Sequence, residues 1–309
     1  MRAIAVHEFG GSPVLVEIPE PVPGPGGVLV RLAAAGVNPF DRKVADGMMK
    51  GSMPHVFPLV LGIDGAGVVE ALGEGVTRFA VGDPVFGTFF HSPAGEGTYA
   101  EYVTVPETNP LALLPAGLDP VVAAALPTAG LTAVQVVDAL EAEAGETVLV
   151  VGATGGVGGF VVQLAAAAGL RVVATGRPAD ADRLRELGAA EVVDHTAGPL
   201  SGRVSDVDAL VHLVGDQEAF RAALAVVRTG GRAFTTTFSA DQDALAARGI
   251  SGGNFEVRGT PDGLSRLADA VSGGRLKVAV EHRLPLAEAA AELARPRSTG
   301  ARGKTVVVI

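Results

Sequence analysis

Hydrophobic and polar positions alternate in the first third of the chain. Val28–Val37 and Gly67–Leu72 carry this period of two, and turns rich in glycine and proline, such as residues 21–27, separate such runs. Because successive side chains of a strand point to opposite faces of a sheet, the alternation is typical of β-strands with one buried face. We therefore predict a β-rich barrel or sandwich for this part of the chain.

The pattern changes after residues 115–120, which read Pro-Ala-Gly-Leu-Asp-Pro. Alanine-rich helical segments then alternate with short apolar runs. These runs are Thr147–Val151, Arg171–Ala174, Asp208–Val214 and Arg232–Thr237. Strands that alternate with helices form a parallel, doubly wound sheet, so the pattern predicts the α/β class.

The C-terminal part is predicted to form one more helix, Asp262–Ser272, and two strands, Lys277–Val280 and Lys304–Ile309, that return to the first domain. A chain of 309 residues is long enough for two domains. The expected domains are residues 1–120 with 260–309, and residues 121–259.

Composition and charge exclude several classes of protein. The chain is 48% hydrophobic and carries a net charge of −10, with acidic residues scattered along its length, so nucleic acid is not an expected partner. Its most apolar stretches, Val121–Val137 and Phe160–Leu170, are interrupted by proline, glutamine or glycine, so we expect no membrane span. The N-terminal residues alternate like a strand and do not resemble a signal peptide, which favours a cytoplasmic protein.

The chain contains no cysteine. This absence removes disulfides, thiolate nucleophiles, iron–sulfur clusters and every zinc site that needs a cysteine ligand. Its six histidines show neither His-x-His nor His-Glu-x-x-His spacing. We therefore expect no protein-bound metal.

A glycine-rich turn, residues 152–159, follows the predicted strand Thr147–Val151 and precedes a helical run. It reads Gly-Ala-Thr-Gly-Gly-Val-Gly-Gly, so Thr154 stands where the commonest dinucleotide fingerprint has its second glycine. Glycines let the backbone approach a pyrophosphate, whose charge is met by the free N–H groups of the helix start. The order strand, turn, helix favours a dinucleotide site over a turn that merely packs tightly.

The next predicted strand ends near Gly176 and Arg177. Proteins that bind NAD place an acidic side chain there, on the ribose hydroxyls. In this chain the first acidic residue after the start of the strand is Asp180. A cation at this place favours the 2′-phosphate of NADP(H). As alternatives, Arg177 is a solvated charge at a strand end, and Arg183 belongs to the polar face of the next helix.

These segments together resemble the medium-chain dehydrogenase/reductase superfamily, and within it the zinc-independent, zeta-crystallin-like quinone oxidoreductases. Besides the glycine turn, the resemblance rests on Val37–Asp41, Leu61–Gly67, Gly97–Tyr102 and Arg302–Lys304. It implies a GroES-like catalytic domain, a Rossmann domain and a homodimer. Zinc-dependent relatives carry Gly-His-Glu where this chain has Gly62-Ile-Asp64, so the resemblance implies chemistry without a metal.

The resemblance also implies roles for individual residues. Asn38 is expected to position the nicotinamide ribose and the substrate carbonyl, unless its amide only caps the following helix, with Asp41 and Asp64 as further polar groups of the pocket. His195 stands where relatives often have a tyrosine. The residues expected to contact NADPH are Thr128, Gly152, Thr154, Gly155, Gly156, Val157, Gly158, Gly176, Arg177, Arg183, His195, Phe238 and Lys304.

The implied activity is hydride transfer from NADPH to a quinone or a related conjugated carbonyl, whose conjugation spreads the incoming charge. Two alternatives stay open: reduction of a carbon–carbon double bond by an enoyl or alkenal reductase, and NADPH binding with little turnover. Both tyrosines, Tyr99 and Tyr102, lie in a segment that is a strand of the barrel in relatives, and no carboxylate pair has a spacing that demands acid–base work. We therefore expect catalysis by positioning, with protons supplied by water.

Overall fold

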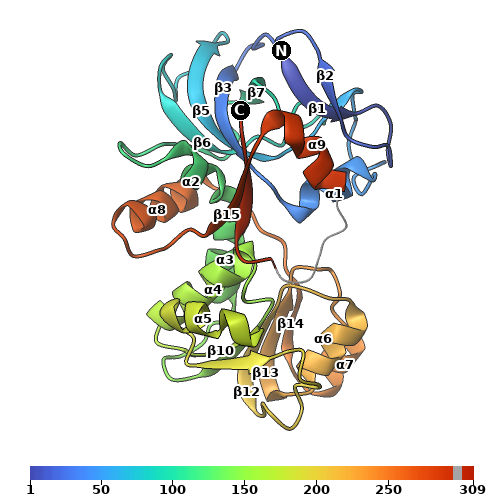
Figure 1. The fold of residues 1–309 in the computed structure, drawn as a ribbon, viewed down its shortest axis with the longest axis vertical. Coiled ribbons are helices and arrows are strands. Elements are labelled where there is room, and N and C mark those ends of the chain that lie inside the picture. The colour runs from blue at the N-terminus through green and yellow to red at the C-terminus, as the bar shows by residue number, and fades with distance from the viewer. Residues whose placement is uncertain (295–300) are drawn as a thin grey trace. The chain divides into compact units, whose positions relative to one another are not determined.

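The computed structural model describes residues 1–294 and 301–309, which form two compact units (Figure 1). The described part of unit 1 is residues 1–131, 259–294 and 304–309, and that of unit 2 is residues 132–258 and 301–303. The first boundary lies inside helix α3 (Pro127–Ala139). The sequence pattern changes earlier, at residues 115–120, because the first helical segments after it still pack in unit 1.

Unit 1 contains two sheets. The larger has the strand order β15-β16-β3-β5-β6-β8, with β7 also paired to β3, and the smaller has the order β2-β1-β4. The strands are β1 (Arg2–Val6), β2 (Val14–Glu17), β3 (Gly27–Gly36), β4 (Leu59–Val60), β5 (Asp64–Leu72), β6 (Pro84–Thr88), β7 (Tyr102–Pro106), β8 (Leu111–Leu113), β15 (Val280–Pro285) and β16 (Lys304–Val308). The β-rich architecture predicted from the alternation is confirmed.

The C-terminal strand β16 does return to unit 1, where it pairs antiparallel with β3 and parallel with β15. The strand predicted over Lys277–Val280 is wrong, since β15 begins only at Val280. Its pairing explains the difference: Val280 lies opposite Lys304, the first residue of β16, so earlier residues have no strand beside them.

Short helices join the strands of unit 1. They are α1 (Pro39–Ala45), α2 (Pro120–Ala124), α8 (Pro261–Ser272) and α9 (Leu286–Ala294), together with the start of α3. Helix α2 packs against the end of β3, where a Cβ on Gly36 would lie 2.1 Å from the carbonyl oxygen of Ala124. Because Gly36 also lies opposite Asp64 of β5, the ends of three elements meet at this point.

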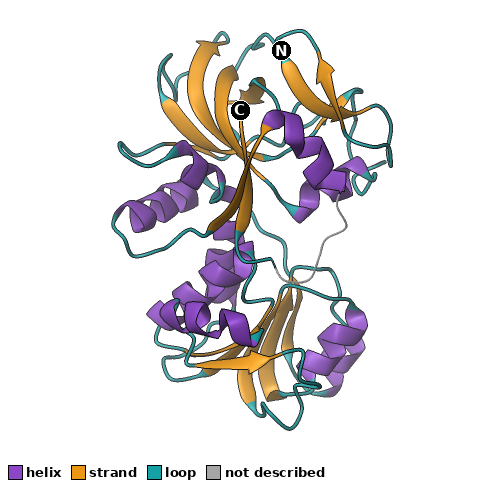
Figure 2. Ribbon diagram, viewed as in Figure 1, coloured by secondary structure: helices purple, strands orange, loops and turns teal. Residues whose placement is uncertain are grey.

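Unit 2 is built on a six-stranded parallel sheet with the order β11-β10-β9-β12-β13-β14. Its strands are β9 (Thr147–Val151), β10 (Arg171–Gly176), β11 (Glu191–Asp194), β12 (Val207–His212), β13 (Val227–Thr235) and β14 (Ser251–Asn254). Its helices, besides the rest of α3, are α4 (Gly156–Ala167), α5 (Ala181–Glu186), α6 (Gln217–Leu224) and α7 (Gln242–Ala247), and they cover both faces of the sheet (Figure 2). The predicted doubly wound sheet is confirmed.

The strand order reverses between β9 and β12. In sheets of this kind, ligands bind outside the carboxyl ends of the strands at such a reversal. The central strand β9 has Val148, Leu149 and Val150 fully buried, as expected for a strand covered by helices on both faces. In the described ranges, no helix combines the length and the apolar character needed to cross a membrane.

Candidate active site

A cluster of buried polar side chains lies where β3 ends and β5 begins. Asn38 precedes α1, Asp41 lies in α1, Asp64 begins β5, Thr128 lies in the first turn of α3 and Lys304 begins β16. Four of them, all but Thr128, are at most 5% exposed. Burying a charged group costs desolvation free energy unless the group is paired or hydrogen-bonded. Each charged group here has hydrogen-bond partners in or beside the cluster.

The Asp64 carboxylate accepts three hydrogen bonds. The Asn38 side-chain amide donates at 2.8 Å, the Thr128 backbone N–H at 3.0 Å and the Thr128 hydroxyl at 2.7 Å. Burial raises the pKa of Asp64, while the charge of Lys304 and these donors oppose the rise. Asp64 therefore anchors both the Asn38 side chain and the start of α3.

The amide of Asn38 is held at both ends. Its oxygen accepts from the Lys304 ammonium at 2.5 Å, its nitrogen donates to Asp64, and Lys304 also donates to the backbone carbonyl of Val37 at 2.7 Å. The Asn38 side chain is thus engaged in the cluster, and Asn38 is also the N-cap residue of α1, with the Asp41 side chain accepting from its backbone N–H. The prediction that Asn38 positions cofactor and substrate stays a prediction, and its rigid seating is what such a role requires.

Asp41 joins the same cluster from the side of α1. Its Oδ2 accepts from the Asn38 backbone N–H at 2.7 Å and from the Tyr99 hydroxyl at 2.5 Å, while its Oδ1 is buried without a hydrogen-bond partner among the described residues. Burial raises the pKa of Asp41 to about 7, with Asp64 adding to the rise and Tyr99, Asn38 and Lys304 opposing it. A carboxyl group that exchanges a proton near neutral pH therefore lies beside a buried phenol.

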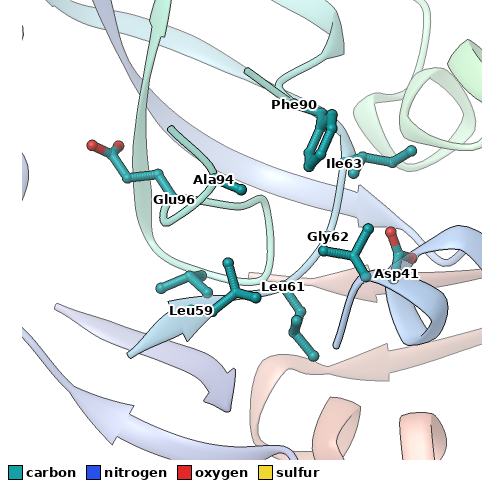
Figure 3. Close-up of a pocket in the computed structure, with 10 residues that line it drawn as sticks. Asp41, Leu59, Leu61, Gly62, Ile63, Phe90, Ala94 and Glu96 are labelled. Carbon is teal, nitrogen blue, oxygen red and sulfur yellow. The ribbon is translucent and has the colours of Figure 1, made fainter. Parts of the chain in front are cut away.

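A small pocket lies next to Asp41 (Figure 3). The Asp41 carboxyl group lies at one end of it, and Glu96 at the other end turns its carboxylate away. The pocket encloses about 10 Å³, which is room for no more than one water molecule. A quinone does not fit there.

Gly62 explains how Tyr99 reaches Asp41. This glycine has φ = +94°, and a Cβ on it would lie 2.8 Å from the Tyr99 ring. Only glycine combines that backbone angle with that closeness, so Gly62 seats the ring. Tyr99 is fully buried, whereas Tyr102 is half-buried on β7.

In unit 2, the glycine turn joins β9 to α4. Gly152 has φ = +87°, and the N–H of Gly155 donates back to the Gly152 carbonyl at 3.2 Å. A Cβ on Gly158 would lie 2.2 Å from the Gly152 oxygen, so Gly158 is needed for the helix to pack on the turn. A Cβ on Gly155 would have one neighbour, the Gly152 oxygen at 3.6 Å. The start of α4, formed by Gly155, Gly156 and Val157, therefore leaves space where a pyrophosphate needs it.

The end of β10 brings together three of the predicted residues. A Cβ on Gly176 would lie 2.6 Å from the Leu184 side chain, so this glycine lets α5 pack on the strand. Arg177 follows it and is exposed. Arg183 is not a solvated residue of the helix surface, because its guanidinium donates to the Thr154 carbonyl at 3.0 Å and to the Arg302 carbonyl at 2.8 Å.

Two further predicted residues follow strands β11 and β13 of this sheet. His195 is exposed after β11, and its N–H donates to the Gly176 carbonyl at 3.3 Å. Phe238, after β13, is 45% exposed with φ = +60°, so it is not a core residue. Bulky residues rarely adopt a positive φ, and such outliers gather at functional sites.

The hydrophobic pattern does not indicate the polar groups that lie at the ends of β12 and β13. His212 is fully buried, and burial lowers its pKa to about 4. One ring nitrogen lies 3.2 Å from the Thr235 hydroxyl, and the other has no partner in the described part of the chain. The hydroxyls of Thr235, Thr237 and Ser239 bond to one another. His212 sits in an apolar strand, where nothing in the pattern distinguishes it from a core residue.

Comparison with known proteins gives two family matches and a set of relatives. Residues 24–116 match the alcohol dehydrogenase GroES-like domain, and residues 187–307 match the zinc-binding dehydrogenase family. Quinone-oxidoreductase QR1, chloroplastic, from Triphysaria versicolor is 30% identical over 99% of this chain and 98% of its own. The chain belongs to the medium-chain dehydrogenase/reductase superfamily.

Two other similar proteins are named for activities other than quinone reduction. NADPH-dependent alkenal/one oxidoreductase, chloroplastic, from Arabidopsis thaliana is 30% identical over 99% of this chain and 79% of its own. A crystal structure of an NAD-dependent alcohol dehydrogenase covers all of both chains at 32% identity, with a TM-score of 0.86. This medium-chain dehydrogenase/reductase is therefore an oxidoreductase of a nicotinamide-dependent family, as the sequence predicted.

The residues present do not fit the zinc ion named by the second family. The chain has no cysteine, and in the described ranges no three histidine, aspartate or glutamate side chains gather in a way that could hold a metal. Asp64, in the segment where zinc-dependent relatives have Gly-His-Glu, is already bound by Asn38 and Thr128. A closed polar cluster thus occupies this place.

Proposed function

We propose that this medium-chain dehydrogenase/reductase transfers hydride from NADPH to a quinone or a related conjugated carbonyl without a metal. The observation that carries the proposal is the cluster around Asp64, whose carboxylate already accepts from Asn38 and Thr128 and lies within the field of the Lys304 charge. An acceptor that needs no Lewis acid suits such a site, because conjugation spreads the charge that hydride brings.

The residues of unit 2 suit a nicotinamide dinucleotide. The backbone N–H groups of Gly155, Gly156 and Val157 would meet the pyrophosphate, and Arg177 would meet the 2′-phosphate of NADPH. When bound, the cofactor supplies the hydride. The part played by unit 1 would be to hold the Asn38 amide rigidly, so that the acceptor is oriented before transfer. Solvent would protonate the reduced oxygens of a quinone.

Steady-state oxidation of NADPH with a panel of acceptors tests the activity. We expect turnover with small quinones, and none with NADP⁺ and simple alcohols. Alcohol oxidation without quinone turnover would overturn the proposal. Cofactor binding without turnover on any acceptor would favour the alternative of a binding protein.

A second candidate is reduction of a carbon–carbon double bond. The relative named as an NADPH-dependent alkenal/one oxidoreductase supports it, because it matches 99% of this chain. Faster turnover with enones than with quinones in the same panel would favour this candidate. A homodimer and a cytoplasmic location stay predictions.

A further inference from the structure

A second arginine reaches the end of β10 from the far end of the sequence. Arg302 pairs with the Asp180 carboxylate at 2.7 Å, and both lie in unit 2. The Asp180 side chain is only 5% exposed, whereas that of Arg302 is 49% exposed. A nearly buried carboxylate is thus covered by a cation at the surface.

Asp180 lies close to the place where dinucleotide-binding proteins distinguish their cofactors. A Cβ on Gly176, the last residue of β10, would lie 3.7 Å from the Asp180 Cβ, and the Asp180 N–H donates to the Arg177 carbonyl at 2.9 Å. An acid near this strand end favours a ribose with a free 2′-hydroxyl and repels a 2′-phosphate. Asp180 would therefore work against NADPH unless its charge were cancelled.

The chain position of Arg302 is fixed by a second link. Its carbonyl accepts from Arg183, and the same guanidinium donates to the Thr154 carbonyl in the glycine turn. Arg302 is therefore tied to the turn as well as to Asp180. Two other acids of this region have partners of their own: Asp182 is paired with Arg185 at the surface, at 3.0 Å, and Asp194, which lies opposite Gly176 on β11, accepts from the Thr196 N–H and hydroxyl.

We infer that Arg302 sets the preference for a 2′-phosphorylated nicotinamide dinucleotide by neutralising Asp180. It is a positioning residue that acts through Asp180, and the inference rests on the proposed use of NADPH. In this arrangement Arg177 attracts the 2′-phosphate, and Arg302 removes the charge that would repel it. Cofactor choice then depends on a residue that no motif around the glycine turn contains.

The test measures binding of NADPH and NADH to the whole protein by titration of cofactor fluorescence. Arg302→Gln should weaken NADPH about tenfold and leave NADH unchanged or tighter, because an uncancelled charge near the site repels the phosphate. Arg302→Lys should keep the preference, since it keeps the charge. Adding Asp180→Asn to Arg302→Gln should restore NADPH binding, because the charge to be cancelled is then gone.

Arg171→Gln is the matched control, since Arg171 pairs with Glu191 at the opposite end of β10. It should change neither affinity. Arg302→Gln could weaken the binding of both cofactors equally, or Asp180→Asn could fail to restore NADPH binding. In either case Arg302 only holds the chain in place, and the inference fails while the proposed function stands. If the unaltered protein binds NADH as tightly as NADPH, the proposed cofactor fails and the inference with it. Arg302→Gln could also fail to fold, which would be seen as a lost thermal transition. In that case, an Arg302→Lys variant that folds but does not prefer NADPH overturns the inference.

Discussion

Arg177 is the residue on which the choice of cofactor depends most directly. An arginine–phosphate hydrogen bond contributes about 1.5 to 3 kcal/mol, so Arg177→Ala should weaken NADPH roughly ten- to a hundredfold and barely affect NADH. Fluorescence titration of both cofactors measures this. Arg171→Ala, at the other end of the same strand, is the control. Equal losses for the two cofactors would contradict the assignment.

Asp41 should make stability depend on pH. Its folded pKa, about 7, lies above its ordinary value of 3.8, so between these values the folded state holds a proton that the unfolded state has lost. The free energy of unfolding contributed by Asp41 is therefore highest at low pH and falls as pH rises through this window. Asp41→Asn removes this contribution.

The measurement is urea unfolding of the native protein and of Asp41→Asn at pH 5 and pH 8. From pH 5 to pH 8, the native protein should lose about 2 to 3 kcal/mol relative to the variant. Other titrating groups, such as His212, cancel in this comparison because both proteins contain them. Parallel pH profiles for the two proteins would show that Asp41 is ionised at both pH values.

Asn38 and Tyr99 separate positioning from proton supply. Asn38→Ala should lower kcat/KM about tenfold or more for quinones and enones alike, because the amide no longer orients the acceptor. Tyr99→Phe should keep most of kcat with a quinone, since solvent protonates the reduced oxygens. Steady-state kinetics on both acceptors measure this. Full activity in Asn38→Ala with collapse in Tyr99→Phe would reverse the two roles.

At the scale of elements, the hydrophobic pattern of a segment predicts those strands whose formation depends on the segment's own residues. The apolar run Thr147–Val151 is strand β9 as predicted, because a central parallel strand needs an unbroken apolar sequence. The hydrogen bonds of the polar cluster could not be predicted from the local pattern, because the bonded residues are far apart in the chain. Asn38 lies 26 residues from Asp64 and 266 from Lys304, so only the antiparallel pairing of β3 with β5 and β16 brings them together.

The two glycines of the turn should respond differently to a side chain. Gly155→Val should leave a folded protein that no longer binds NADPH, because the side chain enters the space left for the pyrophosphate. Gly158→Ala should instead cost roughly 1 to 3 kcal/mol of stability, since its Cβ meets the backbone of Gly152 and Ala153. Thermal unfolding and NADPH titration of both variants distinguish the effects. Normal NADPH binding by Gly155→Val would make the loop a structural turn only.

At the scale of the whole molecule, the C-terminal segment contributes to both units. Arg302 belongs to unit 2 and Lys304 to unit 1, with Gly303 between them at φ = +144°. The resemblance to the family named this segment as a motif and predicted only that Lys304 contacts NADPH. What it does follows from tertiary partners that no local pattern reveals, since Arg302 pairs with Asp180 and Lys304 with Asn38. The same tertiary cluster bears on whether the reaction uses a metal.

Removal of metal should leave the reaction unchanged. In unit 1, the Asp64 carboxylate already accepts hydrogen bonds from Asn38 and Thr128, and Lys304 supplies a positive charge to the cluster. A divalent cation would have to displace those hydrogen bonds and would be repelled by the Lys304 charge. Dialysis against EDTA should therefore alter neither the rate of NADPH oxidation with a quinone nor the Tm. Added Zn²⁺ should not restore or raise activity. An enzyme known to depend on zinc, treated in parallel, shows that the chelator works. A loss of rate with EDTA that Zn²⁺ reverses would overturn the metal-independent chemistry proposed for this oxidoreductase.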